Sequence, residues 1–195
     1  AKAPAYDYII TAEAKGIPLA HEMARQAGDA KYILARKGPK LYMRDIFSVT
    51  VNSITTAKEQ KLYLDGADAA LMKGKRILIT GAAGSIGSEM VRQVAKFSLE
   101  ELVLVDQAET PMHDIRLLMA RKYPDVKAFT IVGSIANPTH MEEIFKEHRP
   151  EYVFHAAAYK HVPMMEDNPA MAIQNNVFGT RVIADLAVKY GTKKF

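Results

Sequence analysis

Short apolar runs alternate with amphipathic helical patterns along the second part of the chain. Four apolar runs predict buried strands, at Ile77–Thr80, Leu102–Asp106, Ala128–Val132 and Tyr152–His155. Apolar residues at helical spacing predict helices at Ser85–Phe97, Pro111–Lys122, His140–His148 and Pro169–Tyr190. Continuous apolar strands that alternate with helices are typical of a parallel sheet covered on both faces. The pattern therefore predicts an α/β fold with a doubly wound, mostly parallel sheet.

The first part of the chain has a different pattern. Tyr8–Thr11 and Lys31–Ala35 predict strands, and Ile17–Ala27 between them predicts a helix that ends before a glycine. β-Branched residues dominate Ile46–Thr56, which favours extended structure and a β-hairpin with Leu62–Leu64. We therefore expect an α/β segment over residues 1–73, followed by a second segment over residues 74–195.

Composition excludes several classes of protein. Hydrophobic residues make up 49% of the 195 residues and charged residues 25%, enough for a sizeable core. The absence of cysteine excludes disulfide and thiolate chemistry and fits a cytoplasmic protein. No apolar run is long enough for a bilayer, no signal-peptide pattern opens the chain, and no metal site is predicted. The net charge of +4, without a basic stripe, gives no reason to expect nucleic-acid binding.

The stretch after the Ile77–Thr80 strand carries the strongest chemical signal. The strand runs directly into a turn with Gly81, Gly84 and Gly87, and then into a helix. Glycine permits the tight turn, the approach of backbone to a pyrophosphate, and close packing of helix on strand. The helix N-terminus presents unpaired N–H groups and the positive end of its dipole to phosphates. The order of these elements predicts the dinucleotide-binding turn of a Rossmann fold.

An acidic residue closes the next strand at the expected distance. Asp106 lies nineteen residues after Gly87, where its carboxylate can accept hydrogen bonds from a ribose 2′-hydroxyl. No arginine directly follows Asp106 to bind a 2′-phosphate. The spacing therefore favours NAD as cofactor, with NADP as the alternative.

The later motifs are more specific. The stretch 155–169, HAAAYKHVPMMEDNP, is followed by NVFGT at 176–180. With the glycine turn, they resemble the extended short-chain dehydrogenase/reductases, and within them the nucleotide-sugar 4,6-dehydratases and epimerases of bacterial polysaccharide biosynthesis. UDP-N-acetylglucosamine 4,6-dehydratases are the most similar type, and the resemblance covers residues 75–195. It implies a dinucleotide and a UDP-sugar as ligands.

The resemblance also assigns residues. It implies that Ala156, Ala157 and Ala158 line the cofactor's path, and that Lys160 and His161 lie on the sugar-nucleotide side. Ser134 stands where such domains usually carry an acid facing the adenine, which predicts weaker adenine recognition. The dinucleotide-binding residues predicted from motif and resemblance together are Gly81, Ala83, Gly84, Ser85, Ile86, Gly87, Asp106, Gln107, Ser134, Ile135, Ala156, Ala157, Ala158 and Asn176.

The same resemblance bears on catalysis. The family's chemistry moves hydride from sugar C4 to the nicotinamide, eliminates water across C5–C6, and returns the hydride. The residues for these steps, and the sugar-binding part, would follow a strand that begins at 193–195. Tyr159 does not supply the dehydrogenases' Tyr-x-x-x-Lys pair, because position 163 is proline. We therefore expect cofactor binding without turnover, and the catalytic residues are unknown.

The first 75 residues carry a second resemblance. Residues 11–18, TAEAKGIP, resemble the pyrophosphate loop of type I phosphoribosyltransferases of the adenine/xanthine kind. Residues 35–41 resemble their next segment, and residues 46–64 their flexible hairpin. A strand-to-helix turn with a lysine suits a phosphate. The residues predicted to form this phosphate site are Glu13, Lys15, Gly16, Arg36 and Lys37.

The two resemblances meet at one strand. In the transferases, a lead-in like that at 73–79 precedes an acidic phosphate loop, but here it runs into the glycine turn at 80–84. The chain therefore resembles a chimera, engineered or recombined. Residues 71–76 contain no spacer rich in Pro, Ser or Gly, which predicts one continuous sheet across both segments. In a Rossmann sheet the second and fourth strands flank Ile77–Thr80, whereas in the transferase-like fold Tyr8–Thr11 would lie beside that strand. Either Tyr8–Thr11 extends the sheet elsewhere, or a Rossmann strand is displaced, or the first segment packs separately.

Three other functions stay open beside a catalytically incomplete dinucleotide-binding module. One is an active dehydratase or epimerase completed by another chain. The second is a phosphoribosyltransferase, which the loss of the acidic loop opposes. The third is an assembly of two α/β fragments with no ligand. A free sheet edge beyond Tyr152–His155 would also allow a homo-oligomer.

Overall fold

The computed structural model describes residues 9–12, 21–22, 24–25, 32–35, 47–52, 59–64 and 71–195. The chain divides into two compact units. The first is Ala1–Lys73 with Lys194, and the second is Gly74–Lys193 with Phe195.

Two small sheets form the described part of the first unit. Strands β1 (Ile9–Ala12) and β2 (Tyr32–Ala35) pair in parallel over four residues each. Strands β3 (Phe47–Asn52) and β4 (Glu59–Leu64) pair antiparallel over six residues each, as the predicted hairpin requires. The described residues of 21–25 are helical, inside the predicted helix.

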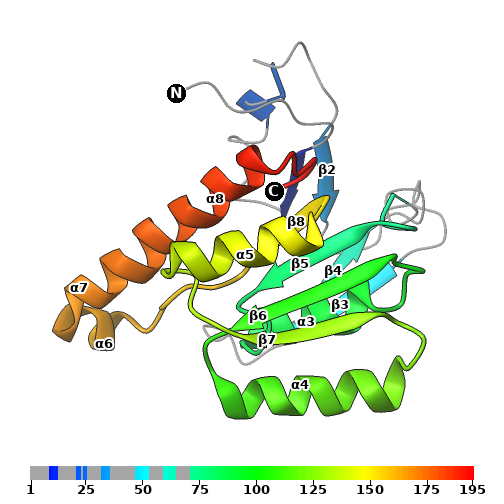
Figure 1. The fold of residues 1–195 in the computed structure, drawn as a ribbon, viewed down its shortest axis with the longest axis horizontal. Helices are drawn as coiled ribbons and strands as arrows, with labels where there is room; N and C mark the ends of the chain where they lie inside the picture. The colour runs from blue at the N-terminus through cyan, green and yellow to red at the C-terminus, as the bar shows by residue number, and fades with distance from the viewer. Residues whose placement is uncertain are drawn as a thin grey trace. The chain divides into compact units, whose positions relative to one another are not determined.

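A parallel sheet of four strands organises the second unit (Figure 1). Its strands are β5 (Arg76–Thr80), β6 (Glu101–Asp106), β7 (Ala128–Val132) and β8 (Tyr152–His155). Their order is β7-β6-β5-β8, and every neighbouring pair is parallel. The chain moves outward from β5 to β7 and then crosses back to β8, so the strand order reverses beside β5. Such a reversal opens a crevice at the carboxyl ends of the strands.

Helices cover both faces of this sheet. Helices α5 (Pro138–His148) and α8 (Thr180–Lys189) contact each other on one face, in front of the sheet in Figure 1. Helix α3 (Ser85–Val94) contacts β5, and α4 (Glu109–Lys122) contacts β7. The Tyr123 hydroxyl donates to the Arg92 carbonyl at 3.1 Å and links the ends of α4 and α3. No described helix is both long and apolar enough to cross a membrane.

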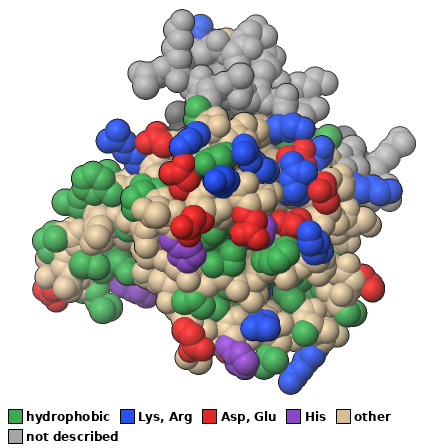
Figure 2. Space-filling model, in the orientation of Figure 1, with side chains coloured by type: hydrophobic (Ala, Val, Ile, Leu, Met, Phe, Trp, Pro, Cys, Tyr) green, Lys and Arg blue, Asp and Glu red, His purple; other side chains and the backbone are tan. Residues whose placement is uncertain are grey.

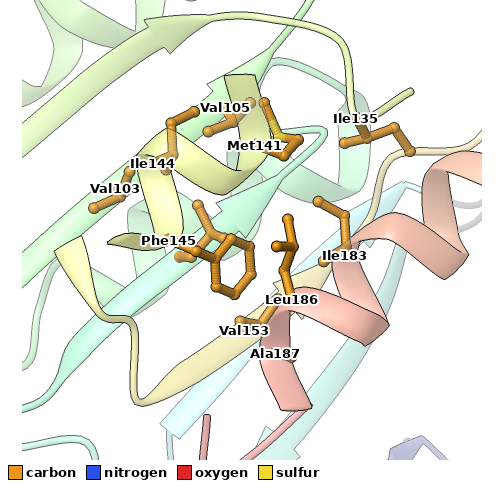
Figure 3. Packing of buried hydrophobic residues seen from close by; sticks show 11 residues of the cluster. Val103, Val105, Ile135, Met141, Ile144, Phe145, Val153, Ile183, Leu186 and Ala187 are labelled. Atoms are coloured by element: carbon orange, nitrogen blue, oxygen red, sulfur yellow. The ribbon is translucent and has the colours of Figure 1, made fainter. Parts of the chain in front are cut away.

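Successive side chains of each strand point to opposite faces of the sheet, so the core has a part on each face. One cluster joins alternate strand residues to the buried faces of α5 and α8, around Phe145 (Figure 3). In β5 and β6 the intervening residues Ile77, Ile79, Leu102 and Leu104 are equally buried. Because the centres of these two strands are buried on both sides, they are continuous apolar runs, which made them recognisable in the sequence. The core cluster in Figure 3 contains Leu78, Val103, Val105, Ile135, Met141, Ile144, Phe145, Val153, Ile183, Leu186 and Ala187.

The last helical region differs from the single helix predicted over Pro169–Tyr190. It consists of α7 (Pro169–Ala172), a π-helical segment η1 (Ile173–Gly179) and α8. A short helix α6 (Val162–Asp167), which the sequence analysis does not predict, precedes it. At the end of η1, a Cβ on Gly179 would lie 2.6 Å from Ile135 Cδ1. Glycine there allows the helical backbone to contact the loop after β7.

The described strands form three sheets, and none of these sheets contains strands of both units. Strand β5 pairs with β6 along Arg76–Thr80 and with β8 along Ile77–Thr80. Both of its edges are therefore occupied by Rossmann strands. Strand β1 pairs with β2 instead, which resolves the competition for one neighbour that the sequence analysis raises.

A buried acid ties the amino ends of β6 and β7 to α5. The Glu101 carboxylate accepts hydrogen bonds from His148 Nδ1 at 2.5 Å and from Lys127 Nζ at 2.7 Å. Glu101 and His148 are both only 6% exposed. Burial raises the pKa of Glu101, but the bonds from Lys127 and His148 lower it by more, so this pKa lies below its ordinary value of 4.5.

We expect Glu101→Gln to lower the free energy of unfolding at pH 7 by about 1–3 kcal/mol, because it weakens the charge-assisted hydrogen bonds that a buried carboxylate accepts. The folded-state pKa is depressed, so the ionised carboxylate stabilises the fold above its unfolded pKa and loses this effect as pH falls. Urea denaturation should therefore show a difference from wild type that shrinks below pH 4.5. Glu147→Gln, an exposed change on α5, is the control. Equal effects of both changes would contradict this account.

Candidate functional site

A cleft of about 230 Å³ lies where the strand order reverses. Segments that follow the carboxyl ends of β5, β6, β7 and β8 form its walls, which is where ligands bind in open parallel sheets. The residues that line it are Gly81, Ala83, Gly84, Val105, Asp106, Gln107, Ala108, Gly133, Ser134, Ile135, Ala156, Ala157, Ala158, Tyr159 and Asn175.

Two glycines of the turn are required by the packing of the protein itself. Gly81 has a φ of +70°, and a Cβ there would lie 2.6 Å from the backbone of Ala156 and Ala157. A Cβ on Gly87 would lie 1.8 Å from the Gly81 carbonyl oxygen. Real Cβ atoms essentially never lie this close to backbone. The turn therefore fits between β8 and α3 only because both positions lack side chains.

Gly84 differs from these two glycines. Its φ of −69° and ψ of 167° suit any residue, and the contact nearest a Cβ there would be the Gly81 carbonyl oxygen at 3.3 Å. Gly84 is exposed, lines the cleft and caps α3 without a side-chain hydrogen bond. The first N–H groups of a helix have no partners within the helix. This end of α3 can therefore bind an anion, and the missing Cβ leaves room for it.

Asp106 joins the end of β6 to the glycine turn. One carboxylate oxygen accepts a hydrogen bond from Ala83 N at 3.0 Å, and the other accepts one from Ala108 N at 3.0 Å. Each oxygen has a second lone pair for a further donor. Asp106 thus has a structural role that the sequence analysis does not predict, and it keeps the capacity to accept hydrogen bonds from ribose hydroxyls.

The wall opposite Asp106 is held by an asparagine of η1. Asn176 Oδ1 accepts from Tyr159 N at 2.9 Å, and Asn176 Nδ2 donates to Tyr159 O at 2.8 Å. Asn175, buried and in the cleft wall, donates to Asn176 Oδ1 at 3.0 Å. The side-chain amide of Asn176 therefore fixes the main chain of the segment that contains Ala156–Ala158.

His155, the last residue of β8, connects this wall to neighbouring elements. The His155 ring nitrogens lie 2.7 Å from Thr80 Oγ1 and 2.9 Å from Thr180 Oγ1. Burial lowers the pKa of His155 below its ordinary value of 6.5, so the neutral ring predominates at pH 7. The neutral imidazole can then donate from one nitrogen and accept at the other, which joins β5, β8 and α8.

Ten of the fourteen residues predicted to bind the dinucleotide line the cleft. Of the others, Ser85 and Ile86 are exposed at the start of α3, Gly87 is buried in the turn, and Asn176 holds the wall. Lys160 and His161 are exposed and do not line it. The predicted phosphate site of the first unit lies outside the described residues, so it stays a prediction; its members are Glu13, Lys15, Gly16, Arg36 and Lys37.

Five cleft residues were missed from the sequence. Val105, Ala108 and Gly133 adjoin predicted residues, so the carboxyl ends of β6 and β7 could have indicated them. Tyr159 and Asn175 adjoin predicted residues too, but the interactions that bring them into the cleft depend on η1. A π-helix leaves no clear signature in apolar periodicity.

The surface chemistry is mixed. Basic and acidic side chains are interspersed over the face in Figure 2, and hydrophobic side chains gather over α6 and α7. Exposed apolar residues of that region include Val162, Met164 and Met171. Among the described residues, no group of three or more His, Asp or Glu side chains could hold a metal ion.

Comparison with known proteins matches residues 77–195, more than half of the chain, to a family described as polysaccharide biosynthesis protein. The capsular polysaccharide biosynthesis protein CapD of Staphylococcus aureus is 39% identical over 125 residues, which are 64% of this chain and 21% of CapD. The dTDP-glucose 4,6-dehydratase of Shigella flexneri is 34% identical over 115 residues, 59% of this chain and 31% of that enzyme. The chain thus spans less than a third of these relatives.

Solved structures share the fold. The enzyme WbmG of Bordetella bronchiseptica, solved with NAD and UDP, has a TM-score of 0.51 and 28% identity, covering 62% of this chain and 36% of WbmG. The predicted Rossmann-like α/β fold is confirmed. The similarity to nucleotide-sugar dehydratases and epimerases is confirmed for residues 77–195, and the comparisons give no support to the phosphoribosyltransferase resemblance.

We expect Gly87→Ala to lower the free energy of unfolding by about 1–3 kcal/mol, the usual cost of overpacking, because its Cβ would overlap the Gly81 carbonyl. Gly84→Ala should change stability much less, since its nearest contact is 3.3 Å. Chemical denaturation of both variants measures the difference. If Gly84→Ala is as destabilising as Gly87→Ala, the two glycines do not have the separate roles described.

Proposed function

The chain belongs to the polysaccharide biosynthesis protein family through residues 77–195, and on this premise we propose that these residues form the NAD-binding half of a nucleotide-sugar 4,6-dehydratase or epimerase. The observation that carries the proposal is the cleft at the strand reversal, where the glycine turn, the uncapped end of α3 and Asp106 converge. When bound, the nicotinamide would accept and return a hydride at the sugar.

The residues present suit a dinucleotide. A pyrophosphate would bind at the first turn of α3 beside Gly84, where a Cβ is absent and no side chain caps the helix. Asp106 would accept hydrogen bonds from the adenosine ribose, and Ala83 N would keep its carboxylate in place. The small side chains of Ala156, Ala157 and Ala158 leave room on the other side of the turn for the nicotinamide half.

Electrostatics favour NAD over NADP. A 2′-phosphate would lie near the Asp106 carboxylate, and like charges at that distance repel each other. Within the lining of the cleft there is no lysine or arginine to offset this repulsion. NADP binding would require a cation to approach from outside the cleft wall.

The sugar side of the proposal rests on relatives. WbmG is solved with UDP, and the Shigella enzyme acts on a dTDP-sugar by its name. We propose a UDP-sugar as substrate, with Lys160 and His161 beyond the alanines on the substrate side. Both side chains are exposed, so they are accessible to such a ligand.

We expect isothermal titration calorimetry to detect NAD binding by the wild-type chain, with weaker binding of NADP. Gly84→Asp should abolish binding of both, because it places a carboxylate where the pyrophosphate would lie. His113→Asp, an exposed change on α4, adds the same group elsewhere and should leave binding intact. Failure of the wild type to bind either cofactor at millimolar concentration would refute the proposal.

We further propose that residues 75–195 need sugar-binding and acid/base residues from other parts of an enzyme for turnover. The 195-residue chain should then bind NAD and leave UDP-N-acetylglucosamine unchanged. Mass spectrometry of the incubated sugar nucleotide tests this, because dehydration removes one water. A product that has lost water would instead identify the chain as an active dehydratase.

A further inference from the structure

A hydrogen bond crosses the candidate cleft. Gln107 Nε2 donates to Tyr159 Oη at 2.6 Å, although the residues are 52 positions apart. Gln107 follows β6 and Tyr159 follows β8, and both line the cleft. Because β5 lies between β6 and β8, the bond passes over the carboxyl end of β5, where the glycine turn begins.

Gln107 and Tyr159 follow strands that are not adjacent in the sheet. Adjacent strands lie about 4.8 Å apart, so β6 and β8 are separated by roughly twice that distance. Two long side chains must extend toward each other to close this gap. The bond thereby joins the two walls of the cleft, with Asp106 next to Gln107 on one side and Ala158 next to Tyr159 on the other.

The backbone on each side of this bond is held by other hydrogen bonds. The Tyr159 main chain donates one hydrogen bond to the Asn176 side chain and accepts one from it. The carboxylate of Asp106, next to Gln107, accepts from two backbone N–H groups. Gln107 is exposed and Tyr159 half-buried. Rotation of either side chain would break the Gln107–Tyr159 bond and leave both cleft walls in place.

We propose, on the basis of the proposed function, that Gln107 and Tyr159 form a strap that opens to admit the dinucleotide and closes again over its pyrophosphate. The bond runs between residues on opposite walls of the cleft, so a dinucleotide can reach the glycine turn beneath it only when the bond is broken. Once closed over the ligand, the strap slows its release, so its role is retention of the cofactor.

The test measures how fast NADH leaves the full chain. NADH-loaded protein is mixed with excess NAD in a stopped-flow instrument, and the nicotinamide fluorescence is followed directly, since the chain has no tryptophan. Tyr159→Phe removes the hydroxyl and keeps the ring and the Asn176 bonds. Loss of one hydrogen bond, about 1 kcal/mol, should raise the dissociation rate about fivefold. Gln107→Met should have a similar effect.

The double variant separates a strap from two independent contacts. If the residues act through each other, Tyr159→Phe combined with Gln107→Met should release NADH no faster than the faster single variant. The control is Tyr123→Phe, which removes a hydroxyl that donates to Arg92 O, away from the cleft; its dissociation rate should equal that of wild type.

Other results of this experiment would contradict the strap proposal, each for a different reason. Wild-type binding with unchanged release from Tyr159→Phe means that the bond does not retain the cofactor. Faster release from only one single variant, or additive effects in the double variant, means that the residues contact the ligand separately. If wild type binds neither NAD nor NADH, the proposed function fails, and the strap fails with it.

Discussion

The site depends on a close approach of backbone to backbone at the glycine turn. Gly81 presses against the start of the segment after β8, and Gly87 brings the first turn of α3 against the Gly81 carbonyl. No side chain fits at either contact. This packing places the N-terminal end of α3 at the cleft that Gly84 lines, where the unpaired N–H groups of a helix N-terminus can bind an anion without a basic side chain.

The remaining polar groups of the cleft stabilise this arrangement before any ligand binds. Asp106 accepts from Ala83 N, so the residue expected to recognise the ribose also fixes the turn expected to bind the pyrophosphate. Asn176 fixes the opposite wall through the main chain of Tyr159, and the neutral His155 joins that wall to β5 and α8. Recognition groups held by the fold in this way bind with little loss of conformational freedom.

The sequence predicts an element best where one physical requirement limits which residue types can occupy its positions. Short continuous apolar runs are typical of strands in a covered parallel sheet, and the predicted bounds of β7 and β8 agree with the structure. Glycine is required where backbones touch, so the turn was recognisable. The Gln107–Tyr159 bond carries no such signal, because glutamine and tyrosine suit many surfaces and their meeting depends on the strand order. The π-helical segment η1 was missed for a related reason, since apolar spacing over so few residues does not distinguish it from an α-helix.

The pairing of β5 shows which of the two predicted environments this strand has. The lead-in at residues 73–79 suits either fold, but a strand has only two edges. Here β6 and β8 occupy both, and the turn that follows β5 has the glycine spacing of a dinucleotide site rather than an acidic phosphate loop. The boundary between the compact units falls between Lys73 and Gly74, just before β5. From β5 to Lys193 the chain therefore belongs to the unit that is built on the parallel sheet.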